Sequence, residues 1–350
     1  MPRGLLLPLA LLPALTLALL PASVSARPQP TTTPEVSLAG RTRFDLERGD
    51  IAAFVAHMVT LGMSRDAVIA VLAKAEPQPK IIDAMTKPAE KSLAWWEYRA
   101  RFLNDARIDA GARLWREHRE LLDAIAMERH VQPEYVLGIL GVETYFGRLM
   151  GRYRVLDALT TLAFDYPARG EFFRRELEQF LLLSRDGELD PLTALGSYAG
   201  AMGAAQFMPS SFQHFAVDED GAGRPNLWTD WADIFGSVAN YLQQHGWEYG
   251  QPVLAEATLG TAPAPTMPAI VTLDTTLSAL REHGMKVASN LDDATACVVI
   301  PAALSSGISY RVGFHNFYVI TRYNRSPMYA MAVNDLAQAI VARVLAPDAP

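Results

Sequence analysis

A single acidic side chain on the apolar face of one predicted helix constrains this chain more than any other feature. Residues 133–147 predict a helix, because Pro133 suits a first helical turn and Gly147 suits the end of the last one. The side chains three, four and seven positions before Glu143 are all apolar: Leu140, Ile139 and Val136. The carboxyl group is therefore desolvated unless a cleft reaches it. Desolvation raises the pKa of a carboxyl group and makes it a proton donor near neutral pH.

The same helix also allows a purely structural interpretation. A buried glutamate can pair with an arginine, and Arg148, Arg152 and Arg154 follow Glu143 closely in the sequence. A glutamate at an exposed helix end is a second structural possibility. The helix alone leaves the catalytic and structural interpretations open.

A second segment, residues 197–212, is rich in small residues. Its glycines and alanines leave the backbone bare, which permits a sharp turn or the close approach of a ligand. The segment also carries neutral hydrogen-bonding groups and flat aromatic faces, which together suit a sugar: Ser197, Tyr198, Gln206, Phe207, Ser210 and Ser211. A tight crossing of two helices would use small residues in the same way, and composition alone favours that alternative.

The overall composition excludes several classes of protein. The chain has 350 residues, enough for two or three compact units, and 50% of them are hydrophobic, which excludes wholesale disorder. A net charge of −7 without any Lys/Arg-rich run argues against a nucleic-acid partner. One cysteine, Cys297, excludes an internal disulfide framework, and the seven histidines show no zinc-peptidase spacing.

Residues 1–26 predict a secretory signal peptide. Arg3 gives a positive start, an apolar stretch follows from Leu5 to Leu20, and small residues precede a cleavage site after Ala26. The apolar stretch is shorter than the ~20 residues that span a bilayer, so cleavage is favoured over retention as an anchor. The segment has no cysteine for lipid attachment, and we expect a soluble mature protein. The Pro/Thr-rich residues 27–40 predict an extended linker.

The body of the chain predicts a mainly α protein with a small β-containing part. Helical spacing recurs over residues 45–72, with a break near Gly62, and over 110–127, 172–183, 234–241 and 329–344, while residues 91–107 are rich in aromatics. Short β-branched or aromatic runs predict strands at 269–273, 296–300 and 317–320. We therefore expect an α+β insert over residues 252–322.

Four segments, taken in order, resemble the lytic murein transglycosylase B family of bacterial cell-wall enzymes. They are VLGILGVETYFG (136–147), GAMGAAQFMPSSF (200–212), NLWTDWADIFGSVANYL (226–242) and NFYVITRYNRSPMYAMAV (316–333). Four long motifs in the right order are far more specific than one. The likeness extends over roughly residues 40 to 345.

The resemblance implies a lysozyme-like catalytic core with a helical subdomain and a small α/β insert. The corresponding division of the chain is a signal peptide (1–26), a linker (27–40), a helical subdomain (41–120), the catalytic core (121–251), the insert (252–322) and a C-terminal segment that returns to the core (323–350). It also implies a location in the bacterial periplasm. Whether the protein has partners among cell-wall synthesis proteins or amidases is a question that the resemblance leaves open.

The resemblance further implies cleavage of the β-1,4 bond between N-acetylmuramic acid and N-acetylglucosamine in peptidoglycan, with a 1,6-anhydro product. Glu143 matches the catalytic acid/base. The positions that match the glycan groove are Ser197, Tyr198, Met202, Gln206, Tyr241, Tyr323 and Tyr329.

Two rival functions follow from the same residues. A hydrolytic muramidase would need a second carboxylate, for which Asp157 or Asp165 are candidates, although a turn or capping role suits Asp165 better. The other rival is a peptidoglycan-binding protein without catalysis, against which the intact Glu143 and Gln206 argue.

No cofactor is expected, but one acidic loop resembles a calcium site of the family. Asp218 and Asp220 fit the first and third positions of the EF-hand pattern, and Asp233 follows close by. Ala222 and Thr229 stand where two further ligands are expected. The sequence thus favours a solvated acidic loop over a calcium site.

Overall fold

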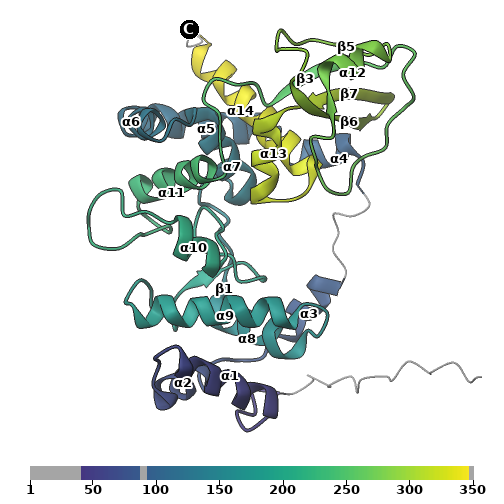
Figure 1. Ribbon diagram of the computed structural model, residues 1–350. Helices are drawn as coiled ribbons and strands as arrows, with labels where there is room; N and C mark the ends of the chain where they lie inside the picture. The colour runs from purple at the N-terminus through teal and green to yellow at the C-terminus, as the bar shows by residue number, and fades with distance from the viewer. Residues whose placement is uncertain (1–40, 87–92, 347–350) are drawn as a thin grey trace, which may run out of the picture. The chain divides into compact units, whose positions relative to one another are not determined.

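The computed structural model describes residues 41–86 and 93–346 (Figure 1). The predicted signal peptide, the linker and the last four residues of the C-terminal segment lie outside the described residues. Among the described residues, no helix is both long and apolar enough to cross a membrane.

The first two helices confirm the predicted break near Gly62. α1 (Gly49–Thr60) and α2 (Arg65–Leu72) flank this glycine, which has a φ of 87°. The Ser64 hydroxyl caps α2 by accepting a hydrogen bond from the Ala67 N–H at 3.2 Å. Most apolar residues of both helices are buried, although Val59 is 42% exposed, and this explains why the spacing predicted the helices correctly.

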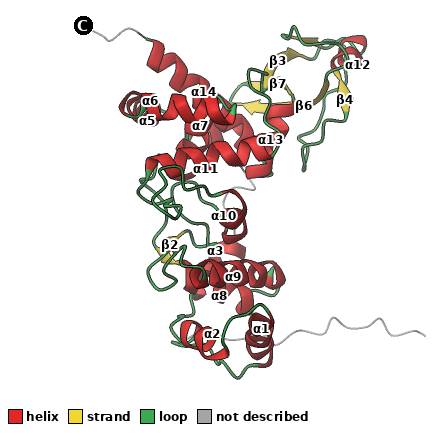
Figure 2. Cartoon of the chain, turned by 60° about the vertical axis from the view of Figure 1, so that its left-hand side comes forward, coloured by secondary structure: helices red, strands yellow, loops and turns green. Residues whose placement is uncertain are grey.

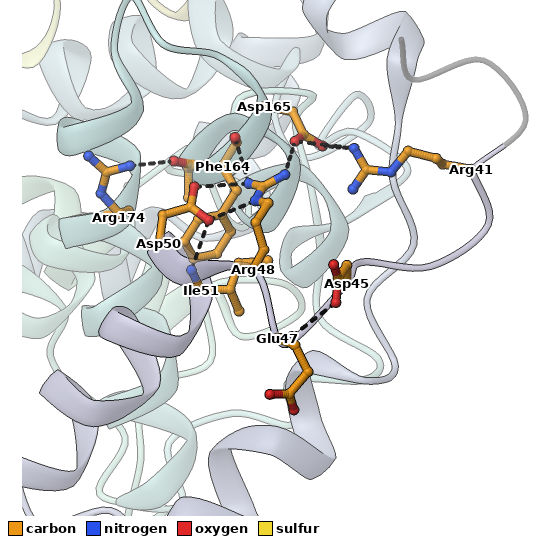
Figure 3. A network of polar contacts seen from close by, with 10 residues as sticks. Arg41, Asp45, Glu47, Arg48, Asp50, Ile51, Phe164, Asp165 and Arg174 are labelled. Atoms are coloured by element: carbon orange, nitrogen blue, oxygen red, sulfur yellow. Dashed lines mark hydrogen bonds and ion pairs between the residues drawn. The ribbon is translucent and has the colours of Figure 1, made fainter. Parts of the chain in front are cut away.

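A network of arginines joins the segment before α1 to the end of α8 (Val155–Asp165), as Figure 3 shows. Arg48 donates to Asp165 at 2.8 Å and to the Phe164 carbonyl at 2.7 Å, and Arg41 contacts Asp165 at 3.4 Å. The Asp165 side chain is almost fully buried by these contacts. The prediction of a turn or capping role for Asp165 was therefore wrong, because its partners lie more than a hundred residues away in sequence.

The helix that carries Glu143 forms the centre of the fold. α7 (Pro133–Thr144) has almost every side chain buried, and it packs against α5 (Asp105–Glu117), α6 (Arg119–Arg129), α11 (Trp231–Gln244) and α14 (Pro327–Leu345) (Figures 1 and 2). The closest approach needs a glycine: a β-carbon at Gly138 would lie 2.7 Å from the Val333 carbonyl oxygen. α7 and α14 can therefore pack backbone against backbone.

The other helices form a second group around α8. α8 packs against α3 (Pro79–Thr86) and α9 (Gly170–Arg185), and α9 packs against α10 (Pro209–Phe215). A two-stranded sheet joins β1 (Tyr153–Arg154) to β2 (Leu195–Gly196) beside this group. The sequence analysis missed α3, α8 and α10, of which two are only seven or eight residues long.

A five-stranded antiparallel sheet with the order β4-β6-β7-β3-β5 forms the β part (Figure 2). Its strands are β3 (Leu254–Thr258), β4 (Thr275–Thr276), β5 (Lys286–Val287), β6 (Ala296–Leu304) and β7 (Gly307–Gly313), with α12 (Leu277–Glu282) between β4 and β5. β6 confirms the strand predicted at 296–300. No strand forms at 269–273, so that prediction was wrong.

The strand predicted at 317–320 is instead part of a helix, α13 (His315–Tyr323). Phe317 and Ile320 are three residues apart and both fully buried, so they lie on one face of the helix. The short apolar run that contains them is equally compatible with a buried strand. α13 packs against α14 and leads the chain back to the core. The fold is thus mainly α with a small sheet, as the sequence predicted.

Candidate active site

Glu143 is the second-last residue of α7, and its carboxyl group is held by a tyrosine from α14. The Tyr329 hydroxyl donates a hydrogen bond to Glu143 Oε1 at 2.6 Å. Tyr329 lies in the first turn of α14, where the Ser326 hydroxyl caps the helix by accepting from the Tyr329 N–H. Burial and the nearby negative charge of Glu143 raise the pKa of Tyr329 well above its usual value, so this hydroxyl stays a donor.

Two further predicted tyrosines lie next to this pair. The Tyr323 hydroxyl donates to the Ala205 carbonyl at 2.6 Å, and the Tyr241 hydroxyl donates to the Arg322 carbonyl at 2.7 Å. The two rings are 4.6 Å apart between centroids. Both hydroxyls are thus committed to backbone carbonyls, and these tyrosines shape the wall of the site.

Tyr98, from α4 (Trp95–Ala100), is a site residue that the sequence analysis missed. It is buried, and it lies close enough to Tyr329 to contribute to the raised pKa of that tyrosine. The aromatic richness of residues 91–107 was the available signal. Packing alone explains such a cluster, so the signal did not single out one ring.

The small-residue segment is fixed directly onto the end of α7. The Thr144 hydroxyl, next to Glu143, donates to the Ala204 carbonyl at 2.8 Å, while the Ala204 N–H donates to the Leu227 carbonyl at 2.7 Å. Gly203, with a φ of 66°, lies so close to Leu227 that a β-carbon would collide with its carbonyl oxygen. The bare backbone therefore serves close packing around the catalytic helix.

Gln206 holds the same loop in place through its side-chain amide. Its Nε2 donates to the Met150 carbonyl at 3.1 Å and to the Gly203 carbonyl at 2.9 Å. Its backbone has a φ of 52°, a left-handed conformation that is uncommon for glutamine. Both N–H donors of the amide are used inside the protein, so only its Oε1 atom is suited to contact a ligand.

The remaining predicted groove residues, Ser197, Tyr198 and Met202, differ in how much of each is exposed to solvent. The Tyr198 side chain is 42% exposed and presents its ring to solvent, as a sugar-stacking residue would. The Ser197 hydroxyl accepts from the backbone N–H groups of Ala199 and Ala201 and so shapes the turn. Met202 is fully buried, and its backbone bridges to Gly196 and Phe207. Its role in the groove stays a prediction.

The end of α7 has an unusual backbone. Tyr145, Phe146 and Gly147 all have φ values between 53° and 77°, in the left-handed region. Arg107, from α5, donates to the Gly141 carbonyl in the last turn at 2.6 Å, and its guanidinium lies 4.6 Å from the centroid of the Tyr145 ring. Arg107 thus links the last turn of α7 to the strained turn that follows it.

The carboxylates that a hydrolytic mechanism would recruit have structural partners. Asp157 accepts from Arg154 at 2.8 Å and from the Glu76 N–H at 2.8 Å. Asp165 belongs to the arginine network of Figure 3. Neither residue is available as a second catalytic group, and Arg154, a candidate partner for Glu143, is already engaged with Asp157.

Three aspartates meet where the acidic loop joins α11, two from the loop and one from the first turn of the helix. The carboxylate oxygens of Asp218, Asp220 and Asp233 lie within 4.8 Å of one another. Burial raises the pKa of Asp233 despite its hydrogen bonds from backbone N–H groups. Asp218 Oδ1 is buried without a hydrogen-bond partner among the described residues. This donor set fits a hard divalent cation, which the sequence alone did not favour.

The comparisons with known proteins agree with this geometry. The Transglycosylase SLT domain family matches residues 47–338. The chain is 38% identical over 355 residues to the membrane-bound lytic murein transglycosylase B of Escherichia coli (strain K12). The alignment covers 94% of this chain and 97% of that protein.

Two solved structures are also similar. The soluble lytic transglycosylase SltB1 from Pseudomonas aeruginosa superposes with a TM-score of 0.80 at 45% identity, covering 84% of this chain and 99% of that one. The E. coli lytic transglycosylase Slt35 in complex with calcium gives a TM-score of 0.79 at 37% identity, covering 87% and 97%.

Proposed function

This chain belongs to the transglycosylase SLT domain family, and we propose that it cleaves the glycan strands of peptidoglycan as a lytic transglycosylase. The bond cleaved is the β-1,4 bond between N-acetylmuramic acid and N-acetylglucosamine, and the product carries a 1,6-anhydromuramic acid end. The single observation that carries the proposal is the Glu143 carboxyl group, held at 2.6 Å by Tyr329 beside the loop that contains Gln206.

One carboxyl group is sufficient for this reaction. Glu143 donates its proton to the glycosidic oxygen, and the bond from that oxygen to C1 of the muramic acid breaks, with the N-acetyl group of the same sugar assisting at C1. The C6 hydroxyl then bonds to C1 and returns its proton to the Glu143 carboxylate. No water is consumed, and the attack is intramolecular, which favours it over hydrolysis.

The surrounding residues orient this single group. Tyr329 fixes one carboxyl oxygen, and Thr144 ties the residue after Glu143 to the Gly203–Gln206 loop. The exposed Tyr198 ring provides a face on which a sugar can stack. A hydrolytic muramidase is less well supported, because Asp157 and Asp165 are engaged in ion pairs.

The site of action that we propose is the periplasm. The sequence of residues 1–26 supports export as a soluble protein, and the match to enzymes named for murein supports a cell-wall substrate. Peptidoglycan strands are the proposed partner.

We also propose that the acidic loop holds a calcium ion through Asp218, Asp220 and Asp233. Support comes from the clustered carboxylates, from the unpartnered Asp218 Oδ1 and from the relative Slt35, solved in complex with calcium. A bound calcium ion would offset most of the repulsion between three adjacent carboxylates and stabilise the loop. It takes no part in the proton transfers of Glu143.

The experiment that tests the activity is digestion of purified sacculi by the wild-type protein and by Glu143→Gln. The variant keeps the shape of the side chain and lacks the transferable proton, so we expect it to release soluble fragments at least ~100-fold more slowly. Equal rates, with both proteins folded by circular dichroism, would overturn the assignment of Glu143.

A further inference from the structure

A buried glutamate on α9 has no part in the reaction described above. Glu176 is 5% exposed, and both hydrogen bonds to its carboxylate come from one residue, Ser210. The Ser210 N–H donates to Oε2 at 2.9 Å, and the Ser210 hydroxyl donates to Oε1 at 2.8 Å. Glu176 forms no ion pair within residues 41–86 and 93–346. Only these two charge-assisted bonds therefore offset the lost hydration of the carboxylate.

The two bonds cap a helix that has no cap of its own. Ser210 stands in the first turn of α10, directly after Pro209, and the preceding residue, Met208, has no side-chain oxygen that could accept from the helix. The first N–H groups of a helix have no partner inside it, and proline has no N–H to satisfy. Glu176 thus caps α10 from another helix. Its two oxygens fix the direction of the first turn as well as its distance from α9.

The chain between this cap and Gln206 is short. Only Phe207 and Met208 separate Gln206 from Pro209. Phe207 is tied to Met202 by two backbone hydrogen bonds, of 2.8 and 3.1 Å. Gln206 itself has a φ of 52°, a conformation that persists only when its surroundings hold it. A shift of the first turn of α10 therefore reaches Gln206 with little intervening chain to absorb it.

Two different helices anchor the loop that contains Gln206. On the side of α7, the Thr144 hydroxyl donates to the Ala204 carbonyl at 2.8 Å. On the side of α9, Glu176 binds Ser210. Gln206 lies between these anchors in the sequence. Because both amide N–H donors of Gln206 bind backbone carbonyls, its Oε1 atom is the one suited to contact a ligand.

We propose that Glu176 is a positioning residue for glycan binding: by capping α10 it fixes Gln206 Oε1 relative to the helix that carries Glu143. The inference rests on the proposed function, because it takes glycan as the ligand of Gln206. An amide oxygen contributes binding and transfers no proton. Misplacing Gln206 therefore weakens substrate binding and leaves the proton transfers of Glu143 intact, so that the loss falls on KM and not on kcat.

Steady-state kinetics on soluble glycan strands test the proposal. Glu176→Ala removes both hydrogen bonds, and we expect KM to rise about tenfold while kcat stays within about twofold of wild type. Glu176→Gln keeps an oxygen for the Ser210 N–H and offers an amide N–H to the Ser210 oxygen, so it should restore a KM close to wild type. A wild-type KM in Glu176→Ala would overturn the proposal.

Leu177→Ala is the matched control, because it truncates the fully buried neighbour of Glu176 and leaves the cap in place. It should lower the melting temperature without changing KM. An equal rise of KM in Leu177→Ala and Glu176→Ala would overturn the proposal, since general loosening of α9 would then explain both. Glu176→Asp is a milder second variant that withdraws the carboxylate from Ser210, and a wild-type KM there would also count against it.

A double variant tests whether the effect passes through Gln206. Once Gln206→Ala has removed the amide, adding Glu176→Ala should raise KM no further. Additive losses in the double variant would overturn the proposed route.

Hydrogen exchange followed by mass spectrometry separates this inference from the proposed function. Residues 203–210 should exchange faster in Glu176→Ala than in wild type and in Glu176→Gln, whether or not the protein cleaves glycan. Unchanged exchange would show that Glu176 does not hold the loop. A wild-type protein that cleaves no glycan strands would sink the proposed function, while the exchange experiment would still decide whether Glu176 is an anchor.

Discussion

Glu143 can act as acid and then as base only if its carboxyl group keeps one orientation through both proton transfers. Tyr329 supplies that constraint with a hydrogen bond of 2.6 Å from a buried hydroxyl. The sequence placed both residues at the site through the family resemblance. Their direct contact could not be predicted, because 186 positions separate them and only the packing of α14 on α7 brings them together.

Tyr329→Phe tests this constraint with little change in shape. The ring stays packed, but Glu143 loses the hydroxyl that orients it, so we expect kcat to fall by ~10-fold or more with the melting temperature nearly unchanged. Steady-state kinetics on peptidoglycan beside thermal unfolding provide the measurement. A variant with normal kcat would show that the hydroxyl does not orient the acid.

Gln206 gives a different expectation, because its amide binds two backbone carbonyls. Gln206→Ala leaves the Met150 and Gly203 carbonyls without these donors, so we expect a loss of ~1–3 kcal/mol in the free energy of unfolding together with lower activity. Chemical denaturation measures the first quantity. Gln213→Ala on the exposed face of α10 is the matched control, and equal stability of the two variants would contradict the structural role of Gln206.

At the scale of elements, a turn of unusual backbone conformation directly follows the helix that carries Glu143. Three consecutive residues in the left-handed region follow Thr144, and Arg107 connects this turn to α5. Helical spacing predicted α7 itself, since Pro133 and the apolar face are local features. Local features did not distinguish α13 from a strand, because its buried residues satisfy either pattern and the contact with α14 decides between them.

Arg107→Lys tests the role of this connection. Lysine keeps the charge but loses the planar group that binds the Gly141 carbonyl and stacks on Tyr145, so we expect kcat to fall by ~10-fold with little change in KM. The matched control is Arg113→Lys, which changes an exposed arginine on the same helix. A lower melting temperature with unchanged kcat would show that Arg107 contributes to the stability of the fold and not to catalysis.

The acidic loop before α11 is an element for which the sequence and the structure lead to different expectations. The pattern of ligands along the chain lacks two members, whereas the fold brings Asp233, in the first turn of α11, close to Asp218 and Asp220. We expect calcium to raise the melting temperature by a few degrees, because binding to the native state alone stabilises it.

Asp218→Asn should abolish that shift, and Asp83→Asn on the exposed face of α3 should retain it. Differential scanning calorimetry with calcium and with a chelator compares the three proteins. Identical melting curves of the wild-type protein under both conditions would contradict the calcium site and support a solvated acidic loop without a bound ion.

At the scale of the whole molecule, distant segments of the chain are joined around one catalytic helix. α14, from the C-terminal end, covers α7, and the arginines before α1 attach the first helices to α8 through Asp165 (Figures 1 and 3). Helical spacing predicted the mainly α class. The ion pairs that join them depend on three-dimensional proximity that no local pattern encodes.

The measurement that tests the central claim most directly is the mass of the fragments released from purified sacculi. A lytic transglycosylase leaves 1,6-anhydromuramic acid ends, which are lighter by one water than the reducing ends of a hydrolase. We predict that mass spectrometry finds the anhydro ends with the wild-type protein, and at least ~100-fold less of them per unit time with Glu143→Gln. Reducing ends as the main product would contradict the account, because a water molecule and a second activating group would then have to act where the structure engages Asp157 and Asp165 in ion pairs.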